Sequence, residues 1–242
     1  MYPPTSIVFF IVPGALVTDA QLKACASLFS SNYGVWSSPV PRVKMGAARL
    51  RDQCLSDPTH SMLALCTIGK ALYHNQASRS FTYYNLRSDI CWITQLVGSR
   101  DYRERGIATS LLQLLPGPDF KCGAFGLATS HPAACLALFK RTCTFRTSLD
   151  LDFIKTHAQK IINTTNISYL KDVQLRGSLL QDAAEAGVVS FVFTAFYVDY
   201  EEPLQALKSW EDRQDMTWPL GVLTKGHEFF CIAPLDTSRS RN

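Results

Sequence analysis

The chain has 242 residues, of which 47% are hydrophobic and 18% charged, with a formal net charge of +4. This apolar content is enough for a sizeable core, and the charges form no long block of one sign, so we expect a globular protein that binds no nucleic acid. No apolar segment reaches the ~18 residues that a membrane span needs, so we expect no membrane partner. The eight cysteines lack metal-ligand spacing, which predicts reduced thiols in a cytoplasmic or nuclear compartment and no metal site.

The N-terminal part alternates strand and helix patterns. Residues 7–12 are β-branched and aromatic and end at Pro13-Gly14, which is typical of a buried strand. A helix is expected to begin at Thr18 or Asp19, because either side chain can cap its first turn. A second helix is predicted over 47–55 and ends before Asp57-Pro58.

Three strand candidates follow without a helix between them, at 61–68, 71–77 and 90–97. This succession favours an antiparallel meander, with a tight turn at Gly69-Lys70. The third candidate is apolar on both faces, so we expect it at the centre of the sheet. A helix over 107–115 and a strand over 124–129 come next, and Ser130-His131-Pro132 then opens a further helix.

The second half of the chain carries weaker patterns. Residues 151–162 are expected to be helical, and 188–198 form the strongest strand pattern in the chain. A short helix is predicted over 203–210 and a closing strand over 228–233, whereas 169–180 is compatible with either helix or strand.

The loop before the helix at 107 contains the run RERGIA, residues 103–108. A strand-to-helix turn with one glycine directs several unpaired backbone N–H groups to one point, and the helix dipole makes that point positive. Gly106 lets an anion approach the backbone, and Arg103 and Arg105 add positive charge. The loop therefore indicates a phosphate site, although an ordinary surface loop with two arginines has the same composition.

The RERGIA run resembles the pyrophosphate loop of the GNAT superfamily of acyl-CoA-dependent N-acyltransferases: Arg or Gln, two residues, Gly, any residue, then Gly or Ala. The surroundings also match, because an apolar strand precedes the loop and the segments GAFGLATS and SHPAA follow its helix. The segment YRERGIATSLL and SHPAA are similar to those of a group of fungal GNAT-like proteins. The resemblance is clearest over residues 60–142.

The resemblance implies an α/β (α+β) mixed sheet, splayed between the strands at 90–97 and 124–129 and flanked by helices. It implies one GNAT-like domain over 1–242, with core elements in 6–142, an inserted helical segment at 145–186, and closing strands and a helix at 187–234. It also implies acetyl-CoA or another acyl-CoA as cofactor. The cofactor-binding residues would be Leu96, Val97 and Gly98 for the pantetheine, the loop residues Arg103, Glu104, Arg105, Gly106, Ile107, Ala108 and Thr109 for the pyrophosphate, and His131 in the next motif.

The expected catalytic groups of this superfamily are missing from their usual places. The strand at 90–97 has no acid in its interior, and the usual tyrosine position falls at Leu138 or Phe139. His74, Asp89 and His227 are the remaining candidate bases, although each also fits an ordinary structural role. The buried-looking Cys91 and Cys135 are interpreted as packing residues, and Glu201-Glu202 as a solvated helix start or a site for a cationic amine.

Two functions are compatible with these patterns. The first is transfer of an acyl group from acyl-CoA to the amine of a small molecule or a lysine by direct attack. The second is a GNAT-fold protein that binds acyl-CoA without N-acetyl transfer, either non-catalytic or redirected to other thioester chemistry in specialised metabolism. The sequence leaves the acceptor, the acyl chain and the oligomeric state open.

Overall fold

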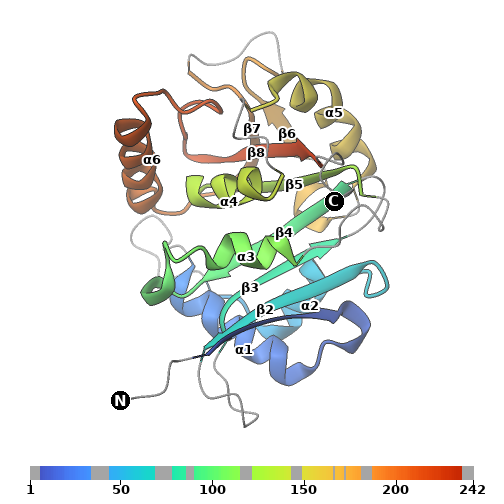
Figure 1. Ribbon diagram of the computed structural model, residues 1–242. Coiled ribbons are helices and arrows are strands. Elements are labelled where there is room, and N and C mark those ends of the chain that lie inside the picture. Colours follow the sequence, from blue (N-terminus) through green and yellow to red (C-terminus); the bar gives the residue numbers. More distant parts are fainter. Residues whose placement is uncertain are drawn as a thin grey trace, which may run out of the picture.

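The computed structural model describes residues 6–33, 44–68, 78–85, 90–114, 122–142, 149–165, 167–171, 173–180 and 187–235. Within them, eight strands form one mixed sheet in the order β1-β2-β3-β4-β5-β8-β7-β6 (Figure 1). The pair β4–β5 is parallel, and the other pairs are antiparallel. The strands are β1 (Ile7–Pro13), β2 (Ser61–Ile68), β3 (Ser78–Asn85), β4 (Ile90–Gly98), β5 (Ala124–Thr129), β6 (Gln174–Arg176), β7 (Phe191–Phe196) and β8 (Gly226–Pro234).

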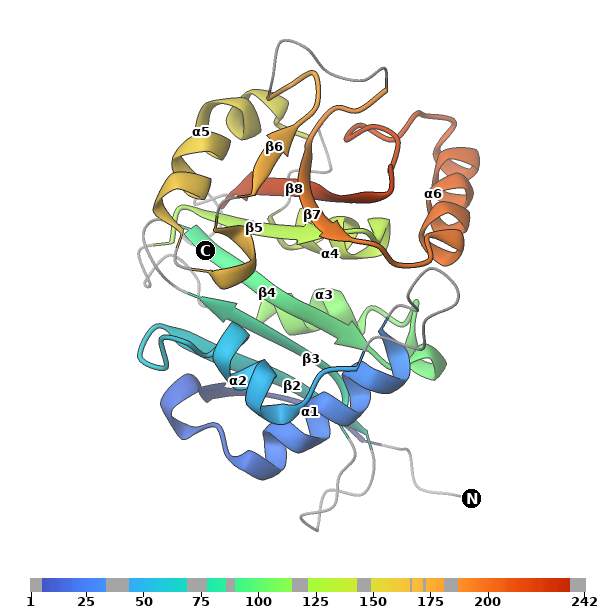
Figure 2. The same ribbon diagram turned by 180° about the vertical axis from the view of Figure 1, so that it is seen from behind.

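Helices cover both faces of this sheet. Figure 1 shows α3 and α4 in front of the strands, and the reverse view in Figure 2 shows α1 and α2 on the opposite face. The helices are α1 (Asp19–Asn32), α2 (Ala47–Cys54), α3 (Ile107–Gln113), α4 (Pro132–Thr142), α5 (Leu151–Thr164) and α6 (Glu201–Gln214), with 3₁₀ turns η1 (Gly14–Leu16), η2 (Arg100–Tyr102) and η5 (Ser168–Leu170). No helix in the described ranges has the length and hydropathy to cross a membrane.

Local sequence explains where α1 begins. The Thr18 hydroxyl accepts a hydrogen bond from the Gln21 backbone, and the Gln21 side chain accepts one from the Thr18 backbone N–H. This reciprocal capping satisfies two donors that the first helical turn leaves unpaired. Leu22, Cys25 and Phe29 then lie on the buried side of the helix, which fixes α1 against the sheet.

The fold class agrees with the expectation drawn from the GNAT resemblance: a mixed α/β sheet that is flanked by helices. The predicted antiparallel meander is confirmed by the pairing of β2 with β3 and of β3 with β4. The apolar strand at 90–97 is central, between β3 and β5. Most other predicted elements are present with boundaries shifted by a few residues, and α6 extends beyond both ends of the predicted helix.

The strand predicted at 71–77 and the turn at Gly69-Lys70 lie outside the described residues. The strand between β2 and β4 is β3, at 78–85, a segment that the sequence analysis did not assign. The middle of β3, FTYY, consists of good strand formers, and serines, an arginine and an asparagine flank it. β3 pairs with β2 on one side and with β4 on the other.

The C-terminal segments differ from expectation at two places. The strand predicted over 188–198 is shorter, because β7 ends at Phe196 after a register shift in which Ala195 adopts a left-handed φ of 54°. The segment at 169–180, left open by the sequence, divides into the end of η5 and the short strand β6.

Candidate functional site

The central sheet separates between β4 and β5. Their parallel pairing stops at Ile93 and Leu127. Beyond these residues β4 follows β3 as far as Gly98, while β5 follows β8 as far as Thr129. The two central strands therefore diverge, as the resemblance implied, and each has a backbone edge that no described strand pairs.

Two features favour this divergence. The register between β3 and β4 shifts so that Thr94 has no Cα partner on β3, and such a bulge bends a strand and increases its twist. At the apex, a Cβ atom added to Gly126 would lie 2.4 Å from the Trp92 ring. The glycine thus allows the large indole to occupy the point where the strands begin to separate.

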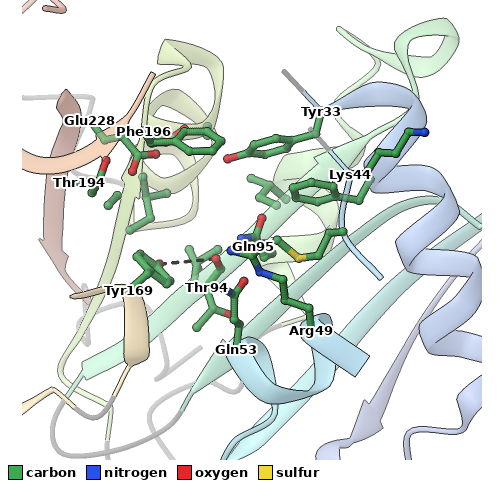
Figure 3. Close-up of a pocket in the computed structure, with 18 residues that line it drawn as sticks. Tyr33, Lys44, Arg49, Gln53, Thr94, Gln95, Tyr169, Thr194, Phe196 and Glu228 are labelled. Carbon is green, nitrogen blue, oxygen red and sulfur yellow. Dashed lines mark hydrogen bonds between the residues drawn. The ribbon is translucent and has the colours of Figure 1, made fainter. Parts of the chain in front are cut away.

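A cavity of about 280 Å³ lies at this divergence (Figure 3). It is bounded by α1, the start and one face of α2, the diverging parts of β4 and β5, and residues of α4, η5, β7 and β8. Its polar lining includes Tyr33, Lys44, Arg49, Gln53, Thr94, Gln95, Tyr169, Thr194 and Glu228. This mixture of aromatic walls and a few polar groups is typical of small-molecule sites.

Glu228 is the acidic residue that lines the cavity. It is 7% exposed and lies near the start of β8, opposite Val192 of β7. Burial raises the pKa of its carboxyl group from 4.5 to about 7, and the nearby Thr194 hydroxyl partly opposes this increase. The Thr194 oxygen nevertheless meets no described partner with the full geometry of a hydrogen bond. A carboxyl group with this pKa can exchange a proton near neutral pH.

Two tyrosines border the same cavity. Tyr33 stacks on Phe29 at 4.2 Å between ring centroids and lies 6.0 Å from Phe196. Burial, assisted by the charge of Glu228, raises the pKa of the Tyr33 hydroxyl, so the phenol stays protonated. Figure 3 shows this hydroxyl directed toward the side of the cavity that holds Glu228.

The second tyrosine is engaged with β4. The Tyr169 hydroxyl accepts a hydrogen bond of 2.9 Å from the Trp92 indole and donates one of 3.5 Å to the Thr94 carbonyl. Burial raises the pKa of Tyr169 well above its usual value. Tyr169 thus helps to close the narrow end of the divergence, where the β4 backbone loses its partner on β5.

The loop before α3 has the backbone that the sequence suggested. Gly106 is the N-cap residue with a left-handed φ of 74°, and α3 has neither a side-chain cap nor an acid in its first turn. A Cβ atom at Gly106 would meet no protein atom within 4 Å. Glu104 also has a left-handed φ, of 60°, so the loop combines two uncommon backbone conformations. The start of α3 is therefore open on the side of Gly106.

The charged side chains near this loop contact one another. Arg103 donates a hydrogen bond of 3.0 Å to the Asn32 carbonyl and forms an ion pair with Glu202 of α6. Arg100 also lies near Glu202, at 3.8 Å. Arg105 instead lies over the Tyr102 ring, 5.0 Å from its centroid. Of the two loop arginines, Arg103 is thus already paired with an acid of the protein.

His131 lies beside this cluster, at the start of α4. Its Nδ1 atom accepts a hydrogen bond from the Ala133 backbone, and its Nε2 atom is 3.8 Å from the Glu202 carboxylate. Burial, together with the charge of Arg103, lowers the pKa of His131 to about 4. The imidazole is therefore neutral at pH 7 and serves as the cap of α4.

The other residues that the resemblance implied for cofactor binding lie in β4 and at the start of α3. Leu96, Val97 and Gly98 form the end of β4, paired with β3 on one side and unpaired toward β5. Ile107 is buried at the first turn of α3, followed by Ala108 and Thr109. The unpaired edge of β4 thus leads directly into the loop and the start of α3.

Of the three candidate bases, only His227 lies in the described part of the chain. His74 and Asp89 lie outside the described residues. His227 is on the face of β8 opposite Glu228, where its ring lies 5.0 Å from Phe193 and its Nδ1 atom is 3.0 Å from both the Thr224 hydroxyl and the Lys225 carbonyl. It is not among the residues that line the cavity.

Glu228, Tyr33, Tyr169 and Arg49 were missed by sequence reasoning. A signal for Glu228 is present in the sequence, because it is a lone acid beside the apolar run FFCIA. A buried strand rarely contains an unpaired carboxylate without a functional reason. The other three residues carry no comparable local signal, since only the fold brings α1, α2 and η5 to the same cavity.

The structure gives the cysteines and the usual tyrosine position a packing role. Cys91 and Cys135 are fully buried, and burial raises the pKa of Cys91 well above its usual value. Leu138 and Phe139 are fully buried as well. Among the described residues, all seven cysteines are free thiols, and no group of three or more potential metal ligands is present.

No protein-family model matches the sequence, and no curated protein matches it. Among solved structures, the ribosomal-protein-S18-alanine N-acetyltransferase from Escherichia coli aligns over 55% of this chain and 75% of its own, at 13% identity and a TM-score of 0.39. The NatC complex bound to Gag peptide and CoA aligns over 55% and 81%, at 17% identity and a TM-score of 0.39. Arabidopsis thaliana NAA60 in complex with a bisubstrate analogue aligns over 55% and 82%, at 13% identity and a TM-score of 0.38.

Proposed function

We propose that the protein transfers an acyl group from acyl-CoA to an amine by direct attack. The observation that carries this proposal is the cavity at the divergence of β4 and β5, where the buried carboxyl group of Glu228 titrates at about pH 7. The free edge of β4 and the open start of α3 lie on the same continuous segment. The extended thioester arm requires the free strand edge, and the diphosphate requires the open start of α3. The acceptor amine requires the cavity with its carboxyl group.

In this scheme the cofactor lies along the unpaired edge of β4. The backbone of Leu96 to Gly98 hydrogen-bonds the pantetheine amides as a neighbouring strand would. The amides of residues 103–109, with the positive end of α3, hold the pyrophosphate oxygens. Glu202 must then share or release Arg103, because a diphosphate and a carboxylate compete for the same guanidinium group.

Glu228 is the general base. As the amine nitrogen forms its bond to the thioester carbonyl carbon, the carboxylate takes a proton from that nitrogen, either directly or through one water molecule. A pKa near 7 suits this task, because the group is substantially ionised at neutral pH yet basic enough to accept the proton. This role replaces the carboxylate that the interior of β4 lacks.

Tyr33 donates a hydrogen bond to the leaving thiolate. The carbon–sulfur bond breaks with both electrons remaining on sulfur, and the phenol stabilises the negative charge that develops there. Burial raises the pKa of Tyr33, so its hydroxyl stays a hydrogen-bond donor while the thiolate takes its proton from solvent or from protonated Glu228. Tyr169 is less suited, because its hydroxyl already bonds Trp92 and Thr94.

Release of free coenzyme A thiol from acetyl-CoA, with and without a panel of amines, tests this function. We expect amine-dependent thiol release whose rate rises with pH through about 7, as Glu228 ionises. If coenzyme A binds but no amine causes acetyl-CoA to release its thiol, the alternative is favoured, namely an acyl-CoA-binding protein that does not transfer the acyl group to nitrogen. Thiol release that is independent of amine would indicate other thioester chemistry.

A further inference from the structure

The cavity has two chemically different ends. Glu228 lies at one end with Thr194 and Phe196, and α2 forms the opposite side (Figure 3). Arg49 and Gln53 lie four residues apart on α2, so they share one face of the helix, and both line the cavity together with Met45, which precedes the helix. Leu50 and Cys54 point instead into the core. This face of α2 is therefore directed toward whatever occupies the cavity.

Arg49 is a solvent-exposed cation on that face. Figure 3 shows its side chain extending from α2 toward Gln95 in the interior of the cavity. Within the described part of the chain it forms no ion pair, and the only acid that lines the cavity, Glu228, is at the other end. Its guanidinium group is thus available to an anion that enters from solution.

Arg51 provides a comparison on the same helix. It donates hydrogen bonds to Asp19 at 2.9 Å and to the Val17 carbonyl at 3.3 Å, which tie α2 to the start of α1. Arg51 does not line the cavity. The helix therefore carries one arginine with structural partners and one that faces the cavity without them.

The groups around Arg49 suit a carboxylate. A guanidinium group binds a carboxylate through two parallel N–H donors, and the amides of Gln53 and Gln95 beside it can donate further hydrogen bonds. Between this end and Glu228, the walls include Tyr33, Phe29 and Phe196, with the first two rings stacked. The cavity thus presents a cationic end, an apolar middle and a carboxyl group.

We infer that the acceptor is a small amine that also carries a carboxylate, with its amine at Glu228, its apolar body between the aromatic rings and its carboxylate paired with Arg49. This inference rests on the proposed function, because it takes the cavity as the acceptor site. A lysine side chain of a protein would leave Arg49 without a partner. A free amino acid-like molecule matches both ends of the cavity.

Matched pairs of amines test the inference. We would measure KM and kcat for 4-(aminomethyl)benzoate against benzylamine, and for phenylalanine against phenethylamine, with the wild-type protein, Arg49→Gln and the control Arg51→Gln. For at least one pair, the wild type is expected to prefer the carboxylate-bearing amine by about 3- to 10-fold in KM, because Arg49 is exposed and solvent weakens its pairing with a carboxylate. Arg49→Gln is expected to remove that preference and to change the KM of the carboxylate-free amine by no more than about twofold. Arg51→Gln is expected to preserve the preference.

Charge reversal gives a second readout. Arg49→Glu is expected to raise the KM for 4-(aminomethyl)benzoate further. It is also expected to lower the KM for p-xylylenediamine, in which a second ammonium group replaces the carboxylate. No preference in the wild type for either pair, or an equal loss for both members of a pair in Arg49→Gln, would overturn the inference.

Binding separates this inference from the proposed function. The same amines are titrated calorimetrically into the protein loaded with coenzyme A, where no turnover occurs. Carboxylate-dependent binding that Arg49→Gln abolishes supports the inference even if no amine releases thiol. Amine-dependent thiol release without any effect of Arg49 on binding or KM would refute the inference while leaving the transferase function intact.

Discussion

The proposed cofactor loop and the proposed acceptor cavity are built in different ways. The loop at 103–109 is one continuous stretch, and its conformation depends on local features, namely the left-handed Gly106 and the uncapped start of α3. The cavity is assembled from segments between α1 and β8, which lie far apart in the sequence. A local motif can thus indicate that a nucleotide-like group binds, whereas the chemistry performed on it depends on tertiary structure.

The largest expected effect comes from removing the carboxylate of the cavity. Glu228→Gln keeps the size of the side chain but cannot accept the proton, so kcat should fall by about 10²- to 10⁴-fold. The inflection in the pH–rate profile near pH 7 should disappear as well. Steady-state kinetics from pH 5.5 to 9 would measure both changes.

His227 provides the matched control for this substitution. It adjoins Glu228 in sequence but faces the opposite side of β8, so His227→Asn should change kcat by no more than a few-fold. A large loss in His227→Asn together with an active Glu228→Gln protein would show that the wrong face of the strand was assigned to catalysis.

The same carboxyl group should make stability depend on pH. Its folded-state pKa of about 7 lies above the ordinary 4.5, so the unfolded chain ionises first as the pH rises and the native state loses stability between these values. Full ionisation costs about 3 kcal/mol. Glu228→Gln avoids this cost, so its advantage over the wild type in urea unfolding should grow by about 2 kcal/mol from pH 5 to pH 8.

The loop can be disrupted independently of the cavity. Gly106→Val places a β-branched residue at a φ of 74° and a side chain on the open side of α3, so coenzyme A binding should weaken at least tenfold. Gly46→Val is the control, since this glycine begins α2 with an ordinary φ of −77° and open space around it. Circular dichroism would establish that both variants fold, and equal affinities would remove the loop from the cofactor site.

The smallest expected effect concerns the ion pair beside the loop. Glu202→Gln releases Arg103 from its internal carboxylate, so affinity for coenzyme A should increase by about 3- to 10-fold at low salt. The gain should shrink at high ionic strength. Weaker binding would mean that Glu202 positions Arg103 for the phosphates and does not compete with them.

The sequence predicts the loop and the central strands well because their signals are local and strong. The apolar run at 90–97 predicts a central strand, and the RERGIA motif predicts a turn into a helix. Each pattern lies in the same few residues whose conformation it predicts. No strand was assigned at 78–85 from the sequence, because serines, an arginine and an asparagine flank the short FTYY run of β3. The pairing of β3 with β2 and β4, which a local pattern does not contain, defines the strand.

The cavity residues could not be predicted for a related reason. Arg49 and Tyr33 are unremarkable on helices, and their shared orientation follows only from how α1 and α2 pack over the divergence of β4 and β5. Glu228 is the exception, because an isolated acid next to the run FFCIA conflicts with the rest of the buried strand. A charge that conflicts with its local environment is thus the one feature of this cavity that sequence analysis can detect.

Titration calorimetry of acetyl-CoA against the wild-type protein tests most directly whether the diverging sheet and the start of α3 form a cofactor site. We expect saturable binding of one molecule with a dissociation constant below about 1 mM, weakened at least tenfold by Gly106→Val and unaffected by Gly46→Val. Absence of binding to the folded protein at millimolar acetyl-CoA would contradict the cofactor site and, with it, the proposed transferase function.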